Sequence, residues 1–468
     1  MGAVIACSDA NGDADAGVTD GMDGGDVDPC QAAAPLWNEV WQVQVEETDL
    51  EGRTPQINLM DVWGAAADDV YAVGFNGTIL HYNGQVWEQM DSGTQEDLEG
   101  VWGFVRTNSE TGEITRKEVF AAGSSGTILR YDGNSWQTQL VIADPDLDNP
   151  DPQEVLDNFH DIWGMPARGD NPATDHPYVV AVGGNGVIVQ FDPVDVRFTE
   201  VRHAEQSEYM VRDENGDVVR DGEGNPITAF RTIYVRPTTE RLGGVFGASN
   251  EGNYFFVAVG NNATILEHSS SPDPATWQRT CALDDMACRW LLPASYTSLL
   301  ASFGDTLPHF NGVWGRGAWE IFVVGLDGLY LMRRNDAYTK CVERGEDRSG
   351  PACVLPANYL RGTWNFYQSH CGEIPDGGTE AERGNTSWVF FVGWGGTLLA
   401  AHDGIICPLS LDTDVRIEGI WGAQPRGESE RIIDGGTEEN PLYACDPIDV
   451  FVTGVNGTIL HLSDPEGR

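Results

Sequence analysis

The chain has 468 residues, of which 41% are hydrophobic, so it is long enough to bury a substantial core. Its 27 basic residues stand against 73 acidic ones, which gives a formal net charge of −46. A surface this acidic repels phosphate backbones and excludes nucleic acid as a class of partner. The same charge favours solubility and attracts basic groups or divalent cations.

Residues 1–34 are predicted to form no packed structure. Residues 7–30 contain seven aspartates, no basic residue and almost nothing to bury, which is typical of a flexible acidic tether. Before this tether, the "VIAC" segment at Val4–Cys7 resembles a bacterial lipobox, whose cysteine becomes lipidated. The charged and apolar parts of a signal peptide are missing, which a start codon assigned too late would explain. We therefore expect Cys7 to be a lipidation site; a chance match is the alternative.

The cysteine content indicates an oxidising compartment. Nine cysteines are present, so a lipidated Cys7 leaves an even number for disulfides. Eight cysteines allow 105 connectivities, so the sequence does not fix the pairing. The candidates that lie close in sequence are Cys281 with Cys288, Cys341 with Cys353, and Cys371 with Cys407, which leaves Cys30 and Cys445.

One pattern occurs seven times along the chain. In the first copy, "DVWG" (61–64) precedes "DVYAVG" (69–74), a turn and "NGTILHY" (76–82). Each apolar run is short, rich in Val, Ile, Phe, Tyr and Thr, and bounded by Gly, Asn or Asp, which is typical of β-strands. The aromatic residue of the first segment recurs in every copy as Trp63, Trp102, Trp163, Phe246, Trp314, Trp364 and Trp421. These aromatic side chains are predicted to fill the space between neighbouring sheets.

The turns predict how the strands of one copy are connected. "FNGT" (75–78) and "YNGQ" (82–85) are predicted to be type I′ turns, because this turn needs positive φ at both central residues. With "VWEQM" (86–90) as the last strand, each copy has four antiparallel strands, named A to D in chain order. Repeated four-stranded sheets in a radial arrangement form a β-propeller. The predicted fold is therefore all-β, a seven-bladed β-propeller over residues 35–468.

The seventh copy has no D strand after "NGTILHL" (456–462). The segment "VWQVQV" (40–45) matches the D strands "VWEQM" and "SWQTQL" (135–140). We expect this N-terminal strand to complete the last blade and close the ring, which removes exposed sheet edges. A Cys30–Cys445 disulfide would then join the two ends of the chain.

The repeats resemble those of bacterial β-propellers of the YVTN and BNR (Asp-box) type, especially units of the form "IWG…DVYAVG…GTILHYDG..W". The resemblance covers about residues 35–462 and concerns residues that build the scaffold. It implies a propeller found in secreted and lipid-anchored proteins, and it implies no particular activity.

Function is expected in the loops that interrupt the repeats. Insertions between strands A and B and insertions between strands D and A would emerge on opposite faces. The D–A face is the predicted functional face, because four consecutive insertions would form a wall beside the channel mouth; they span 141–159, 203–242, 282–310 and 345–360. Within them, 208–235 is predicted to protrude as one or two hairpins. Residues 288–305 are predicted to include a short helix. Core packing is the favoured role of its apolar residues, with contact to a partner as the alternative; they are Leu291, Leu292, Leu299, Leu300 and Phe303.

No catalytic constellation can be identified. One position on strand C carries a different residue in nearly every copy: His81, Arg130, Gln190, Glu267, Met332, Ala400 and His461. Among 73 acids, the sequence does not single out the facing pair that a glycosidase needs. No cofactor and no metal site are predicted. The loop carboxylates that could hold calcium are Asp144, Asp146, Asp148 and Asp151, and a solvated loop is the favoured interpretation.

These observations favour a non-enzymatic, extracytoplasmic protein that binds a protein or glycan through a propeller face and its inserted loops. The chain is expected to be monomeric and to be secreted or anchored at the outer membrane or cell surface through Cys7. The alternatives are a secreted carbohydrate-active enzyme, a glycosidase or lyase with its site at the channel mouth, and a scaffold or assembly factor for a membrane complex.

Overall fold

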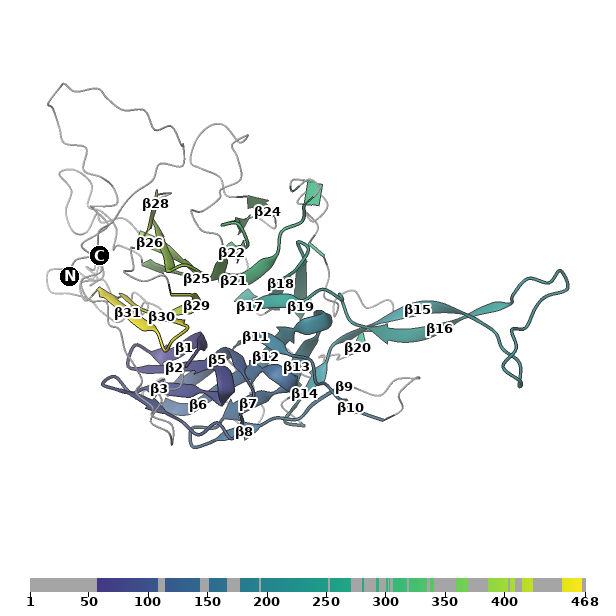
Figure 1. Cartoon of the computed structure of the whole chain (residues 1–468), viewed down its shortest axis with the longest axis horizontal. Helices are drawn as coiled ribbons and strands as arrows, with labels where there is room; N and C mark the ends of the chain where they lie inside the picture. The colour runs from purple at the N-terminus through teal and green to yellow at the C-terminus, as the bar shows by residue number, and fades with distance from the viewer. Residues whose placement is uncertain are drawn as a thin grey trace, which may run out of the picture.

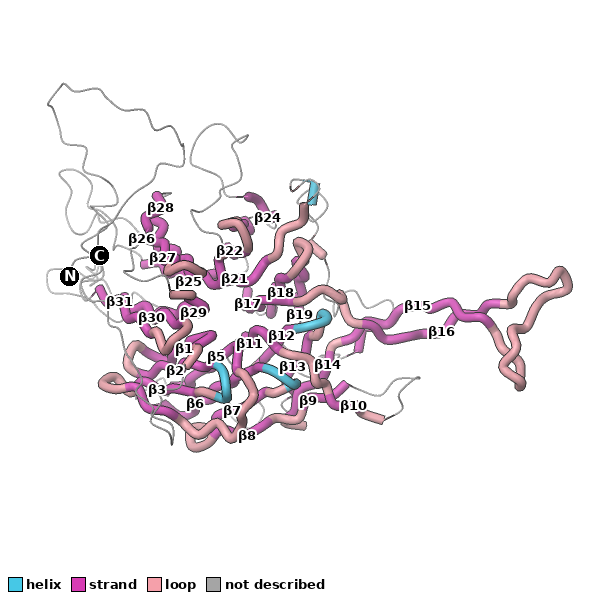
Figure 2. The backbone as a smooth tube through the Cα atoms, in the orientation of Figure 1, coloured by secondary structure: helices cyan, strands magenta, loops and turns pink. Residues whose placement is uncertain are grey.

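A computed structural model of the chain describes residues 57–107, 114–143, 151–165, 177–192, 195–250, 253–270, 280–281, 292–293, 300–301, 303, 306–317, 320–334, 337–340, 359–368, 386–402, 405–408, 415–423 and 448–464. The described part is built from β-sheets joined by turns (Figure 2). The all-β prediction is therefore confirmed. Within these residues, no helix is both long enough and apolar enough to span a membrane.

The sheet of the first repeat has the predicted order of four antiparallel strands. These are β1 (Leu59–Ala66), β2 (Asp69–Gly74), β3 (Ile79–Tyr82) and β4 (Trp87–Gln89). The second sheet repeats this order with β5 (Leu98–Thr107), β6 (Ile114–Gly123), β7 (Ile128–Tyr131) and β8 (Trp136–Thr138). Two later sheets do the same: β21 (Phe310–Gly317), β22 (Glu320–Gly325), β23 (Tyr330–Arg334) and β24 (Ala337–Lys340), then β25 (Leu360–Gln368), β26 (Thr386–Gly393), β27 (Thr397–His402) and β28 (Ile405–Pro408).

The other repeats vary this plan within the described residues. Three strands are described for the fourth sheet, β17 (Leu242–Asn250), β18 (Asn253–Gly260) and β19 (Ile265–Ser270), and three for the seventh, β29 (Ile417–Gly422), β30 (Ile448–Gly454) and β31 (Ile459–Asp464). The third sheet contains β11 (Phe159–Met165), β12 (Tyr178–Gly183), β13 (Ile188–Asp192) and β14 (Arg197–Glu200). It is extended by β9 (Val141–Ala143) and β10 (Gln153–Glu154), because β9 pairs in parallel with β14. Part of the 141–159 insertion, predicted as a loop, is thus strand.

The first strand of every repeat faces the centre of the molecule. Each of these inner strands packs beside the next one in chain order, from β1 through β5, β11, β17, β21 and β25 to β29 (Figure 1). Strand β29 also packs beside β1. The remaining strands of each sheet lie progressively farther from the centre, which is the radial arrangement of a β-propeller.

The turns between the second and third strands follow one backbone pattern. In the first repeat, Asn76 has φ 55° and Gly77 has φ 68°, so "FNGT" has the two positive φ values that were predicted. The corresponding pairs in the other repeats also have positive φ at both residues: Ser125–Gly126, Asn185–Gly186, Asn262–Ala263, Asp327–Gly328, Gly395–Gly396 and Asn456–Gly457.

The prediction for "YNGQ" was wrong. Only Gly84 (φ 85°) has positive φ there. The Asn83 side chain explains the difference, because its Oδ1 accepts hydrogen bonds from the backbone amides of Gln85 and Val86, both at 3.1 Å. Asn83 thus stabilises a turn through its side chain and does not enter the left-handed region.

The repeated aromatic residue packs against the neighbouring sheet, as predicted. The ring of Trp63 lies where a Cβ on Gly103 would be, at 2.7 Å, and the ring of Trp102 stands in the same way against Gly164 at 2.6 Å. At these positions a side chain after the aromatic residue would strike the indole, which explains the glycine; the sixth repeat differs, with Asn365 after Trp364. Trp421 continues this packing from the last repeat to the first, against Gly64.

A long two-stranded hairpin leaves the body of the molecule between the third and fourth sheets. It consists of β15 (Arg202–Met210) and β16 (Thr228–Val235), with β20 (Thr280–Cys281) beside its base (Figure 1). This is the predicted hairpin within the 203–242 insertion. In the 282–310 segment, Leu300 and Phe303 pack against the core, as predicted. The same prediction was wrong for Leu292, which is 53% exposed.

Several sequence predictions lie outside the described residues. They concern Cys7, the closing strand 40–45, and Asp144, Asp146 and Asp148. The backbone is described for Cys281 in β20 and Cys407 in β28, without their side chains. The other cysteines, Cys30, Cys288, Cys341, Cys353, Cys371 and Cys445, also lie outside, so their disulfides stay predictions. Asp151 is described and is exposed.

Candidate functional site: the central pocket

A register irregularity occurs at the same place in all seven inner strands. In β1 the pairing with β2 passes from Leu59 to Asp61 and skips the residue between them. A residue skipped in this way is the mark of a β-bulge, which changes the direction of a side chain. The skipped residues, called the axial residues below, are Met60, Glu99, His160, Gly243, Asn311, Arg361 and Glu418.

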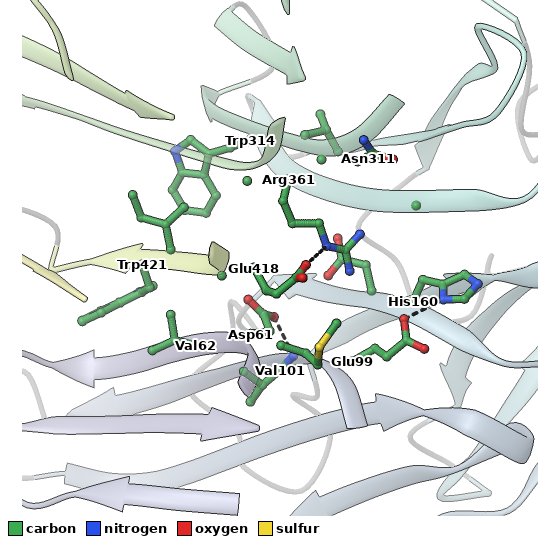
Figure 3. A pocket seen from close by; sticks show the side chains of 18 of the residues that line it. Asp61, Val62, Glu99, Val101, His160, Asn311, Trp314, Arg361, Glu418 and Trp421 are labelled. Atoms are coloured by element: carbon green, nitrogen blue, oxygen red, sulfur yellow. Dashed lines mark hydrogen bonds and ion pairs between the residues drawn. The ribbon is translucent and has the colours of Figure 1, made fainter. Parts of the chain in front are cut away.

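All seven axial residues line one central pocket (Figure 3). They lie near the start of each inner strand, where the D–A connection enters the sheet. The turn between the second and third strands lies at this end too, since the Asn76 amide donates to Asp97 Oδ1 just before β5 (2.9 Å). The charged layer of the pocket is thus on the D–A side, and this end of the pocket is called the mouth below.

A second set of pocket residues lies two positions farther along each inner strand. Six of them are aliphatic and one is Thr363. The Thr363 hydroxyl is buried, with the residue 6% exposed, and it has no hydrogen-bond partner among the described residues. The pocket therefore changes from charged at the axial residues to aliphatic one layer deeper. The aliphatic members are Val62, Val101, Ile162, Val245, Val313 and Ile420.

Two ion pairs link axial residues of neighbouring sheets. His160 Nδ1 lies 2.8 Å from Glu99 Oε2, and Arg361 Nε lies 3.3 Å from Glu418 Oε2 (Figure 3). Glu418 also pairs with Arg416 just outside the pocket. Burial works to raise the pKa of Glu99, but the hydrogen bond and charge of His160, with the charge of Arg361, hold this pKa below its ordinary value. The mouth is thus a network of paired charges.

Two aspartates occupy the position after the axial residue, where the other five repeats have glycine. Asp61 Oδ2 accepts a hydrogen bond from the Val101 amide, and Asp161 Oδ2 accepts one from the Val245 amide, both at 2.8 Å. Each aspartate therefore joins its inner strand to the next sheet. Glycine is needed in neighbouring repeats because the strands come so close: a Cβ on Gly419 would lie 2.7 Å from Asp61 Cα.

The pKa values of the two aspartates are raised from the acidic range to the neutral range. Burial raises the pKa of Asp61 to about 7, although backbone hydrogen bonds and the charge of Arg361 lower it. Burial and the negative charge of Asp61 raise the pKa of Asp161 to about 8. Each raised pKa reflects the cost of a carboxylate charge in a desolvated position.

An aromatic and arginine cluster lies on the rim of the pocket in the sixth repeat. Tyr359 and Trp394 stack with ring centroids 4.0 Å apart, and the Arg416 guanidinium lies 4.4 Å from the Trp394 ring centroid. Tyr359 also donates a hydrogen bond to the axial Asn311, whose Nδ2 donates to the Leu360 carbonyl. The rim is therefore continuous with the axial residues.

The candidate site residues named from the sequence are not those of the central pocket. The varied strand-C position does not form one site: His81 pairs with Asp69 at 2.7 Å, and its equivalent His461 pairs with Asp449 at the same distance. The acids that do converge, Asp61 and Asp161 among them, were not singled out. The signal was present in the alignment of the repeats. The residue three places before each aromatic differs in most copies, whereas the residue before it is always Leu, Phe or Ile and the residue after it is always Gly or Asp.

The chain is similar in arrangement to solved propeller structures. One is the WD40 β-propeller domain of Doa1, at 8% identity, covering 90% of this chain and 94% of the other, with a TM-score of 0.44. YCF48 bound to a D1 peptide gives 12% identity, 91% and 96% coverage, and a TM-score of 0.42. YCF48 from Cyanidioschyzon merolae gives 13% identity, 90% and 98% coverage, and a TM-score of 0.39. No protein-family model matches the chain, and no curated protein matches its sequence.

At these scores the similarities assign neither a family nor a ligand to the chain.

Proposed function

We propose that this protein is a binding module that receives a protein ligand at the mouth of the central pocket, on the D–A side. The observation that supports the proposal is the contrast between constant and varied positions in the inner strands. Residues that pack the sheets together recur in the repeats, whereas the axial residues include acids, a base, an amide, a histidine and a thioether. A position released from packing in every repeat is available for recognition.

The proposal includes a closed ring of seven blades. Three contacts between the last and first repeats support it: β29 packs beside β1, Trp421 packs against Gly64, and the Asn456 amide donates to Asn58 Oδ1 (3.2 Å). The segment 40–45 would supply the outer strand of the seventh blade. Deleting residues 36–46 should lower the free energy of unfolding far more than deleting residues 9–28 of the tether. Equal effects of the two deletions would argue against closure by this strand.

The location of the protein is also a proposal. The lipobox-like segment before Cys7 and the acidic tether after it support an extracytoplasmic protein held to a membrane by a lipid. Metabolic labelling with a fatty-acid analogue should label the protein, and Cys7→Ser should abolish the label. A wild-type protein that takes up no label would leave a secreted form as the alternative.

Binding at the mouth is tested by comparing two surfaces of the same protein. A mouth variant combines Glu99→Gln with Trp394→Ala, and a hairpin variant carries Phe230→Ser at a residue that is 67% exposed. Photo-crosslinking in membrane extracts should give a partner that the mouth variant loses and the hairpin variant keeps. A partner kept by the mouth variant, or a glycan array that gives mouth-dependent binding without any protein partner, would overturn the proposal.

A carbohydrate-active enzyme is the second candidate, because Asp61, Asp161 and Arg361 line one pocket and both carboxyl groups have raised pKa values. A carboxyl group that keeps its proton near neutral pH is what a general acid requires. Turnover on a panel of polysaccharides that is lost in Asp161→Asn would favour this function over binding alone. No turnover on the panel would leave the two aspartates with their observed role as links between strands.

A further inference from the structure

One sector of the pocket mouth lacks an axial side chain. The fourth repeat has Gly243 at this position, and a Cβ there would meet Arg241 Nη1 at 3.2 Å. The guanidinium of Arg241 therefore lies over the place that an axial side chain fills in the other repeats. It brings a positive charge to the mouth from the residue just before β17.

Arg241 differs from the other arginines around the mouth in its partners. Arg361 pairs with Glu418, and Arg416 pairs with Glu418 and stacks on Trp394. The Arg241 guanidinium makes no hydrogen bond and no ion pair with any of the described residues. Its pKa is lowered by burial and by the positive charge of Arg361, while charge interactions with Glu99 and Tyr359 oppose this. Among the described residues, Arg241 is thus a partly buried cation without an ion-pair partner.

A guanidinium presents two parallel N–H groups that match the two oxygens of a carboxylate. A carboxylate at Arg241 would supply the missing counter-charge and would face the cation of Arg361 as well. The ligand must carry few charges in total, because the whole chain has a formal net charge of −46 and repels polyanions. Polyuronates and nucleic acids fit this requirement poorly, and a single terminal carboxylate fits it well.

The layer below the axial residues indicates what adjoins the carboxylate. Val245 and Val313 lie on the sheets next to Arg241 and line the same pocket, and most other residues of this layer are aliphatic. Sugar hydroxyls would find few hydrogen-bonding groups there, whereas an aliphatic side chain would be buried favourably. The single polar residue of this layer is Thr363, whose hydroxyl is buried and has no hydrogen-bond partner among the described residues.

We infer that the mouth recognises the free C-terminal carboxylate of a partner protein whose last residue is aliphatic, with the carboxylate on Arg241 and the side chain in the aliphatic layer. This inference rests on the proposed function and names its ligand. It adds Arg241, which lies at the edge of the pocket, to the recognition residues.

The test uses the full chain and a library of eight-residue peptides that end in Leu, Ile or Val, each made with a free and with an amidated C-terminus. Fluorescence anisotropy should show that the free form binds roughly tenfold or more tightly than the amide. Arg241→Gln should remove this preference, and Arg241→Lys should keep part of it. Arg231→Gln, at an exposed hairpin arginine, is the matched control and should bind as the wild type does.

Equal binding of free and amidated peptides would overturn the inference, as would an Arg241→Gln variant that binds like the wild type. If an oligouronate binds in an Arg241-dependent manner and no peptide binds, the inference is wrong, and the carboxylate that Arg241 recognises belongs to a sugar acid. The two proposals fail separately. If the crosslinked partner is lost in the mouth variant but kept by Arg241→Gln, the mouth binds a protein and the carboxylate assignment is wrong.

Discussion

The inner strands contain two regions that differ within three residues of the same segment. The aromatic and glycine positions face the neighbouring sheet, and they are nearly constant because an indole occupies the space where a side chain would begin. The axial position, three residues earlier, is bulged out of the ladder toward the pocket and differs in most repeats. Packing thus restricts the aromatic and glycine positions of the repeated strand and leaves the axial position free for recognition.

The largest expected effect comes from removing an aromatic ring between sheets. Trp364 is fully buried, at 0% exposure, so Trp364→Ala should lower the free energy of unfolding by about 3–5 kcal/mol. Trp394 on the rim is 38% exposed, and Trp394→Ala should cost less than about 1.5 kcal/mol, the contribution of a stacked and partly solvated ring. Chemical denaturation measures both. Similar losses for the two tryptophans would contradict the separation of packing and recognition positions.

Adding a side chain to Gly422, the glycine that contacts the Trp364 ring, should have the next largest effect on stability. A Cβ on Gly422 would lie 2.6 Å from the Trp364 ring, so Gly422→Val should destabilise the fold by about 1–3 kcal/mol through overpacking. Gly222 in the hairpin tip has no atom within 4 Å of such a Cβ, and Gly222→Val is the matched control. Thermal unfolding of the two variants gives the comparison. A Gly422 variant as stable as the control would show that the glycine is not required.

The repeat architecture was predictable because its causes are local. Asn76–Gly77 and the equivalent pairs have the backbone that their sequence favours, and the alternation of apolar runs and turns gave the order of strands. Trp102 and its equivalents were correctly expected between sheets. The exception at Asn83 arose from side-chain hydrogen bonding, which a dipeptide pattern does not distinguish from a type I′ turn.

The pocket was less predictable because its residues come together only when the sheets are arranged around a centre. Asp61 and Asp161 are 100 positions apart in the chain, and nothing local shows that the negative charge of one raises the pKa of the other. Arg241 could not be recognised either, because its exposure to the mouth depends on the missing side chain at Gly243. The varied axial position was visible, but the bulge that turns it inward was not.

The raised pKa of Asp161 predicts that the free energy of unfolding depends on pH. The pKa of Asp161 is raised from 3.8 to about 8, so the folded protein keeps a proton that the unfolded chain releases between these values. The contribution of Asp161 to stability therefore falls as pH rises from about 4 to about 8. Asp161→Asn should match the wild type near pH 4 and exceed its stability near pH 8, by on the order of 1–2 kcal/mol.

The control for this pH series is Asp68→Asn, which removes one negative charge at an exposed position. Denaturant titrations across the range measure each variant against the wild type. A wild type that gains stability relative to Asp161→Asn as pH rises would show that Asp161 is ionised in the fold. In that case the link between Asp161 and the Val245 amide would be a charged one.

The smallest expected effect on stability belongs to the axial residue Glu99. Its dependence on pH is opposite to that of Asp161, because the pKa of Glu99 is lowered and that of Asp161 is raised. The pKa of Glu99 is held below its ordinary value because the hydrogen bond and charge of His160 outweigh burial. Its ionised form thus adds stability above the unfolded pKa of about 4.5, and this stability is lost as pH falls through the lower, folded pKa. Glu99→Gln should cost less than about 1 kcal/mol near pH 7 and nothing near pH 3. The same titrations measure it, and a Glu99→Gln variant that becomes more stable than the wild type at high pH would mean that the axial charges repel one another as one acidic cluster.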